Sequence, residues 1–323
     1  MTHRLLDSLA LTVAVTLATG AVMLGAAYAP APHGDAELDS LATATSPVGL
    51  VSWAVHAVEV PEAPPAARAV LGAVPPALDE CRHEAERMLQ QGAGGSDRLF
   101  LESGSGAVRV DGRPGLEQVR VVARLCASEE SYLEHMDVTL ERQGSTLELR
   151  THYPERRERA RWGNDYARLD LVVEVPGGMD ADVEDGSGAL ELNGLGSLRI
   201  DDGSGDIAVQ GARDVRIVDG SGGIRVREAR GDVEIDDGSG EIDVDGVEGN
   251  VTVIDGSGSI SVRRVSGDVI VRDGSGSIDV RGVGGDFIVR ADGSGSLNWS
   301  EVSGRVQVPE KHRASRRSWR GQS

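Results

Sequence analysis

The sequence predicts an all-β fold, a single-stranded parallel β-solenoid (right-handed β-helix) with about 17–19 residues per coil. The tetrapeptide Asp-Gly-Ser-Gly occurs seven times, at steps of 17, 17, 18, 18, 18 and 19 residues. A fixed period of this size is typical of stacked repeats. Between the tetrapeptides, apolar and polar residues alternate, which indicates strands with one buried face. The tetrapeptides begin at Asp185, Asp202, Asp219, Asp237, Asp255, Asp273 and Asp292.

Each repeat carries apolar residues at five aligned positions, which we expect to face the interior. In one repeat they are Ile242, Val244, Val247, Val251 and Val253. A single coil cannot offset the entropy lost when it is ordered, so the coils must fold as a stacked array.

The two ends of such a stack would expose strand edges and core. Trp299 replaces valine in the last repeat, and we expect it to act as a structural end cap there. The irregular strands that precede the repeats should close the other end.

The tetrapeptides are interpreted as corners between strands. Glycine at the second and fourth positions permits positive φ, and Asp and Ser can hydrogen-bond to nearby backbone. Stacked aspartates at the usual strand spacing would repel by about 0.9 kcal/mol per neighbouring pair even in water. We expect the seven side chains to relieve this by fanning into water. The alternative is that calcium binds to their oxygens, which makes the seven aspartates weak candidate metal ligands. We nevertheless predict that the protein binds no metal and no cofactor.

The chain is divided by composition. The stretch from Ser8 to Ala29 is apolar or small and ends in Ala-Tyr-Ala, which indicates a cleaved export signal or a retained anchor. The Pro/Ala-rich tether that follows should contain helical pieces near Ala66–Ala73 and Ala77–Gln90. The predicted regions are 1–29 signal peptide or membrane anchor, 30–80 tether, 81–180 irregular β region capping the solenoid, 181–308 regular repeats and 309–323 basic disordered tail.

Both readings of the N-terminus predict an exported protein, in the periplasm or on the surface of a bacterium. Cys81 and Cys126 are the only two cysteines. In an exported protein such a pair predicts a disulfide, with two separately buried thiols as the alternative. Their spacing matches no zinc pattern.

Charge and composition limit the function. The net charge of −19 argues against nucleic-acid binding, and a membrane contact is expected only through an uncleaved N-terminal segment. Sugar-cleaving β-helices need clustered catalytic groups and aromatic platforms, whereas Lys311 is the only lysine and aromatic residues are 3% of the chain. We therefore predict no catalytic residues and no enzyme. In one outward column Ile270 and Ile288 are stacked, as a weak partner contact or as scattered exposed residues.

The segments "VPGGMDADVEDGSGALELNGL" and "SGDVIVRDGSGSIDVRGVGGDFIV" resemble the bacterial putative-adhesin β-strand-repeat family, a domain of unknown function. The resemblance covers roughly residues 98–308. It implies a β-solenoid in the cell envelope and no established catalytic residues.

The expected function is a non-enzymatic, exported cell-envelope protein, structural or adhesin-like, that presents a repetitive acidic face to an envelope protein or polysaccharide. One alternative is a carbohydrate- or calcium-binding β-helix, which could be enzymatic. Another is a partner-binding component of an envelope-sensing system, with Ile270 and Ile288 at the contact.

Overall fold

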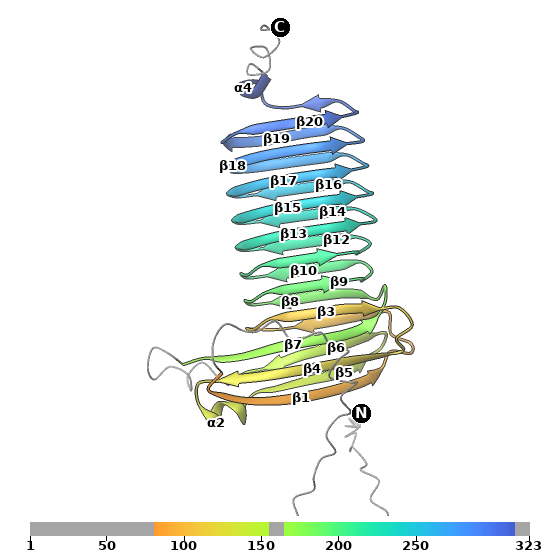
Figure 1. Ribbon diagram of the computed structural model, residues 1–323, viewed down its shortest axis with the longest axis vertical. Coiled ribbons are helices and arrows are strands. Elements are labelled where there is room, and N and C mark those ends of the chain that lie inside the picture. The colour runs from red at the N-terminus through yellow and green to blue at the C-terminus, as the bar shows by residue number, and fades with distance from the viewer. Residues whose placement is uncertain (1–80, 155–164, 314–323) are drawn as a thin grey trace, which may run out of the picture. The chain divides into compact units, whose positions relative to one another are not determined.

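The structure, a computed structural model, describes residues 81–154 and 165–313. The described residues contain 21 strands and form a parallel β-solenoid of about seven turns, with about 18 residues per turn. Two sheets face each other, and each coil contributes one strand to each sheet (Figure 1). The fold class predicted from the repeats is confirmed. The predicted signal peptide or anchor, the tether and the helical piece at Ala66–Ala73 lie outside the described residues.

In the regular repeats, one sheet, called the B sheet, contains the strand that ends at the Asp of each tetrapeptide. The other, the A sheet, contains the strand that follows. The B-sheet strands are β8 (Asp180–Asp185), β10 (Leu198–Asp202), β12 (Val215–Asp219), β14 (Val233–Asp237), β16 (Val251–Asp255), β19 (Phe287–Ser294) and β21 (Val306–Gln307). The A-sheet strands are β9 (Leu190–Asn193), β11 (Ile207–Gln210), β13 (Gly222–Ala229), β15 (Gly240–Val247), β17 (Gly258–Val265) and β20 (Leu297–Val302). The strand β18 (Val269–Val283) continues through a corner and belongs to both sheets.

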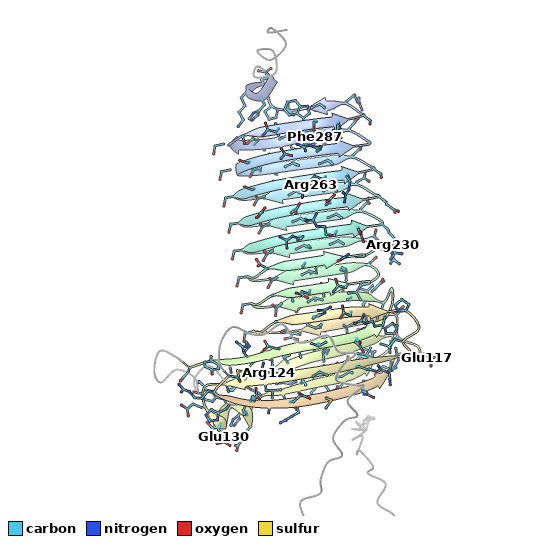
Figure 2. All side chains as sticks on the ribbon, in the orientation of Figure 1. Glu117, Arg124, Glu130, Arg230, Arg263 and Phe287 are labelled. Carbon is cyan, nitrogen blue, oxygen red and sulfur yellow. A yellow bond between two sulfur atoms is a disulfide. The ribbon has the colours of Figure 1, made fainter. Side chains whose placement is uncertain are left out.

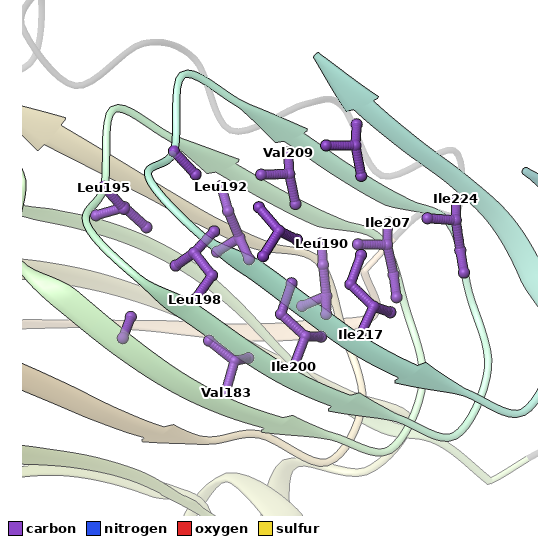
Figure 3. Packing of buried hydrophobic residues seen from close by; sticks show 14 of the residues in the cluster. Val183, Leu190, Leu192, Leu195, Leu198, Ile200, Ile207, Val209, Ile217 and Ile224 are labelled. Carbon is purple, nitrogen blue, oxygen red and sulfur yellow. The ribbon is translucent and has the colours of Figure 1, made fainter. Parts of the chain in front are cut away.

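The strands pair in the register that the repeat alignment predicts. Ile224 pairs with Ile242, which pairs with Ile260, and Val233 pairs with Val251 in the other sheet. The apolar columns point into the space between the sheets (Figure 3), and their members are nearly all under 10% exposed. Register errors would turn these residues outward, so the buried columns fix the pairing.

The extra residue of the 19-residue repeat lies in a strand and not in a turn. Val271 pairs with Val289, but Arg272 pairs with Ala291, so Arg290 is the inserted residue. A bulge of this kind leaves one residue unpaired and restores the register beyond it.

The N-terminal part of the solenoid is threaded out of sequence order. The strands β2 (Arg98–Glu102) and β3 (Val108–Arg113) form one coil, and β6 (Thr146–His152) and β7 (Ala167–Pro176) contribute to another. β2 pairs with both β6 and β8, and β3 pairs with both β7 and β9. The coil that comes first in the sequence is therefore inserted between two later ones, and its Ser-Gly-Ser-Gly at residues 103–106 is an additional corner.

Antiparallel strands cover this end of the stack. β4 (Gln118–Ala127) pairs with β7, β1 (His83–Gly92) pairs with β4, and β5 (Asp137–Gln143) pairs with β6; α2 (Glu130–Leu133) lies beside them (Figure 1). The helical piece expected at Ala77–Gln90 is wrong from residue 83 onward. Ten consecutive residues of β1 pair with β4, and this tertiary pairing outweighs the local helix propensity of the segment.

A disulfide joins Cys81 to Cys126, whose Cα atoms are 5.6 Å apart. Cys126 is a buried residue of β4, and the bridge lies where β1 begins to pair with that strand. It therefore ties the start of the described chain to the covering strands.

At the other end, Trp299 is half-buried in β20, and its ring centroid is 6.3 Å from that of Phe287. The segment predicted as a disordered tail begins with an ordered part, because residues Glu310–Arg313 form α4. Lys311 Nζ donates hydrogen bonds to the carbonyls of Asp292 and Gly293 at 2.6 and 3.0 Å, which hold this turn against the last corner. Residues 314–323 lie outside the described part.

The two glycines of each corner are required for different reasons. The fourth residue of every tetrapeptide has φ between +136° and +155°, as predicted. A Cβ there would also lie 1.5–1.9 Å from a carbonyl oxygen of the preceding coil. The second glycine does not have positive φ, which corrects the expectation for that position. It is needed because a Cβ would lie 1.9–2.6 Å from the backbone of the coil below.

We predict that Gly240→Ala unfolds or severely destabilises the chain, by more than about 4 kcal/mol. The added Cβ would lie 1.6 Å from the carbonyl oxygen of Gly222 at a φ of +154°. Gly94→Ala is the control, because its Cβ meets no atom within 4 Å, and it should change stability by less than about 0.5 kcal/mol. Urea unfolding followed by circular dichroism measures both, and equal effects would contradict the role of the corner.

Candidate interaction faces and the interior carboxyl file

The outer face of the A sheet carries a network of ion pairs between neighbouring coils. Asp245 lies 2.9 Å from guanidinium nitrogens of both Arg227 and Arg264, and Asp243 lies 2.7 Å from Arg263. Asp245 is only 8% exposed, and Figure 2 shows Arg263 on this face. Parallel in-register stacking places these opposite charges in consecutive rungs. The network therefore stabilises the stack by cross-strand attraction.

The outer face of the B sheet has a different character near the C-terminal end. Ile270 pairs with Ile288, and both are half-buried, so the structure brings the two predicted residues together. Ile254, 39% exposed, lies two residues after Thr252, the partner of Ile270. We call Ile254, Ile270 and Ile288 the isoleucine patch. Ile254 was not predicted as part of this contact, although its two-residue spacing from Thr252 puts it on the same face.

A shallow groove lies at the corners where A-sheet strands lead into B-sheet strands. Glu228 and Arg264 have left-handed backbone with φ of 56° and 53°, and Gly246 occupies the same position in the coil between them. Arg230 extends outward beside it (Figure 2). The lining has charges of both signs and no aromatic ring for a sugar to stack on. The lining residues are Gly211, Glu228, Ala229, Arg230, Gly246, Val247, Glu248, Arg264 and Ser266.

An exposed ladder of acidic and amide side chains lies at the corner where each A-sheet strand leads into the next B-sheet strand. In each case Oδ1 accepts a hydrogen bond from the backbone N–H of the next coil. The donor and acceptor pairs are Asn250 to Asp232 at 2.8 Å, Asp268 to Asn250 at 2.9 Å, Asp286 to Asp268 at 2.7 Å and Arg305 to Asp286 at 2.7 Å. The bond from the Arg305 backbone lowers the pKa of Asp286, as expected for a carboxylate that accepts hydrogen bonds.

The aspartates of the tetrapeptides point inward, which corrects the expectation that they fan into water. We call the seven of them the interior carboxyl file. Six are 2–6% exposed, and the side chain of Asp292 is 1% exposed. They stack in register, since Asp202 pairs with Asp219 and Asp219 with Asp237.

Each central carboxyl of the file has one oxygen bonded and one not. Oδ1 accepts the backbone N–H of the serine two residues later, at 2.9–3.3 Å. Among the described residues, Oδ2 of Asp202, Asp219, Asp237, Asp255 and Asp273 has no hydrogen-bond partner. The Asx-turn predicted from the motif is present, but it satisfies only half of each carboxyl.

Burial is the largest influence on these groups. It raises the pKa of Asp202, Asp219 and Asp255 to about 6, with further contributions from neighbouring carboxylates of the file. Burial also raises the pKa of Asp185, Asp237 and Asp273.

The donor set of the file does not suit a hard divalent cation. Calcium takes six to eight oxygen ligands, whereas each coil offers one unbonded oxygen beside apolar columns. Within residues 81–154 and 165–313, no group of three or more His, Cys, Asp or Glu side chains is arranged to hold a metal ion. No helix in these residues is long and apolar enough to cross a membrane.

The model of the family Toastrack DUF4097 matches residues 127–323, which is more than half of the chain. The chain belongs to the toastrack family. The resemblance seen in the repeat segments is thereby confirmed. None of the curated proteins matches this toastrack chain.

Solved structures similar to this toastrack chain include proteins described as adhesins. A putative cell adhesion protein from Clostridium sporogenes is 12% identical, with 70% of this chain and 98% of that chain covered and a TM-score of 0.28. A putative adhesin from Bacteroides fragilis is 12% identical, with 69% and 96% covered and a TM-score of 0.33. A putative adhesin from Parabacteroides distasonis is also 12% identical, with 67% and 97% covered and a TM-score of 0.40.

We predict that Asp245→Asn destabilises the solenoid by about 1–2 kcal/mol, because it removes the buried carboxylate shared by Arg227 and Arg264 and leaves Arg227 with Asp243 alone. The loss should shrink at high salt, because salt screens the ion pairs that Asp245 makes in the wild-type chain. Asp279→Asn is the matched control on the same outer face, since the described residues give Asp279 no ion pair. Urea unfolding at low and high salt measures both variants. An equal loss of stability in Asp245→Asn and Asp279→Asn would contradict the prediction.

Proposed function

We propose that the protein is an exported, non-enzymatic module of the bacterial cell envelope, a stiff structural or adhesive β-solenoid. The observation that carries the proposal is the unbroken stack itself. Parallel paired strands, with one bulge at Arg290, and five buried apolar columns run from β8 to β20, so the same surface positions recur once per coil. Such a surface suits a partner that is itself repetitive, because many weak contacts add up when they are linked.

Charge and redox chemistry support this proposal. The chain has a net charge of −19, and the exposed ladder of acidic and amide side chains presents the carboxylates of Asp232, Asp268 and Asp286. A repetitive acidic face fits an envelope polysaccharide or protein with complementary basic or hydrogen-bonding groups. The disulfide between Cys81 and Cys126 is the kind of bond that persists in oxidising compartments outside the cytoplasm.

A second candidate is contact with a protein partner through the isoleucine patch. On the B-sheet face the outward column changes from the charged Arg199, Arg216 and Glu234 to Thr252, Ile270 and Ile288. Clustered exposed apolar residues with a polar surround are a common feature of interaction sites. This candidate would make the solenoid a partner-binding component of an envelope-sensing system.

One experiment tests both ideas in intact bacterial cells. A photo-crosslinking amino acid is placed at Ile270, or at Arg199 in the same outward column as the control, and cells are fractionated after illumination. We expect the chain in the envelope or periplasmic fraction, with adducts from position 270 and none from 199. Recovery in the cytoplasmic fraction would contradict the envelope proposal, and equal adducts from both positions would contradict the isoleucine patch.

A further inference from the structure

The interior carboxyl file runs the length of the solenoid and has different groups at its two ends. At the N-terminal end Ser103 takes the place of aspartate in the coil next to Asp185, because Glu102 pairs with Glu184. At the C-terminal end Asp292 is held by His312 and by Lys311, whose Nζ lies 3.5 Å from Oδ2. The file is therefore closed by a hydroxyl at one end and by basic groups at the other.

The middle of the file lacks such basic groups. The serine N–H bonds only Oδ1, and Oδ2 lies inside without a donor from the described residues. An ionised carboxylate in this position loses its hydration, and the backbone N–H groups of the following serine and glycine offset only part of that loss, since burial remains the largest influence. Its neighbours in the adjacent coils carry the same group at the spacing of one strand, so ionising all of them adds repulsion along the whole file.

A neutral carboxyl avoids both costs. Its Oδ2–H becomes a donor that can turn toward the carboxyl of the next coil, as amide groups do in stacked amide ladders. We propose that the interior carboxyl file is a proton-binding element, which takes up protons from water in mildly acidic surroundings and thereby tightens the stack of coils.

The charged groups around the file agree with this assignment. Asp201 and Asp236 face outward one residue before Asp202 and Asp237, and add negative charge beside them. Lys311 and His312 act only at the last rung, and the interior columns beside the file are apolar. Burial raises the pKa of Asp202, Asp219 and Asp255 to about 6. Asp214 lies outside the file at an exposed corner, and there a hydrogen bond from the Ser197 hydroxyl lowers its pKa.

The direction of the pH effect follows from these shifts. A carboxyl whose pKa rises from 3.8 to about 6 on folding binds more protons in the folded chain than in the unfolded chain over that interval. The stability it contributes is fully present below pH 3.8 and is lost as pH rises through about 6. Carboxylates in ordinary ion pairs give the opposite dependence.

The test compares two adjacent substitutions in the purified full-length chain, Asp202→Asn inside and Asp201→Asn outside. Both remove one negative charge from β10, but only the first removes an acid from the file. Urea midpoints are measured between pH 5 and pH 8. We expect the wild-type midpoint to fall as pH rises, Asp201→Asn to keep that slope, and Asp202→Asn to show a shallower slope and a higher midpoint than wild type at pH 8.

Equal slopes in the two variants would assign the pH effect to net surface charge and overturn the proposal. A wild-type midpoint that rises with pH would also overturn it. The pH 8 series is repeated with sodium, potassium, calcium or choline chloride at equal ionic strength. A midpoint raised by one metal cation alone would show that a cation, and not a proton, occupies the file.

A direct readout does not depend on any variant folding. Aspartate labelled with ¹³C at Cγ reports the ionisation of each carboxyl by NMR. We expect several resonances of the wild-type chain to titrate near pH 6, and their number to fall by one in Asp202→Asn. Titration of every aspartate near its ordinary pKa would overturn the proposal.

Discussion

The close approach of consecutive coils at the glycine corners is the constraint on which the rest of the structure depends. At the fourth corner position the backbone of one coil lies where a Cβ of the next would be, within 1.5–1.9 Å of a carbonyl oxygen. No other residue fits, so the corner can stack only on another corner. Because the strands leave the corners in the same direction, their parallel pairing and their register follow from this one contact.

Stacking like on like has opposite consequences for different side chains. For the isoleucines and valines it gives continuous apolar columns that no single coil could bury. For the aspartates it brings like charges together. The exposed ladder and the interior carboxyl file differ in how their side chains are hydrogen-bonded. The exposed ladder bonds the backbone of the next coil, as Asp232 does with Asn250, whereas in the interior file Asp237 bonds Ser239 of its own corner. Only the first arrangement joins neighbouring coils by side-chain to backbone hydrogen bonds.

Much of this could be predicted from the sequence, because the repeat gives the columns directly. The inward position of Asp202 could also have been found, since it lies two residues after the buried Ile200 on a strand, but its polar character argued against burial. The threading of β2 and β3 between later coils could not be found in this way. It depends on pairings such as Leu99 with Leu147 and with Ala181, which join distant segments of similar composition. The strand at His83–Gly92 likewise depends on β4 as its partner.

Amide hydrogen exchange, followed residue by residue, tests the stacking of the corners most directly. The N–H groups of Gly222 and Gly240 donate to the carbonyls of Ser239 and Ser257 in the next coil, at 3.0 and 3.1 Å. If the coils support one another, these amides should exchange slowly and at similar rates, and protection should decrease toward β20 and β21. Corner amides in the central coils that exchange as fast as exposed loop amides would contradict the account.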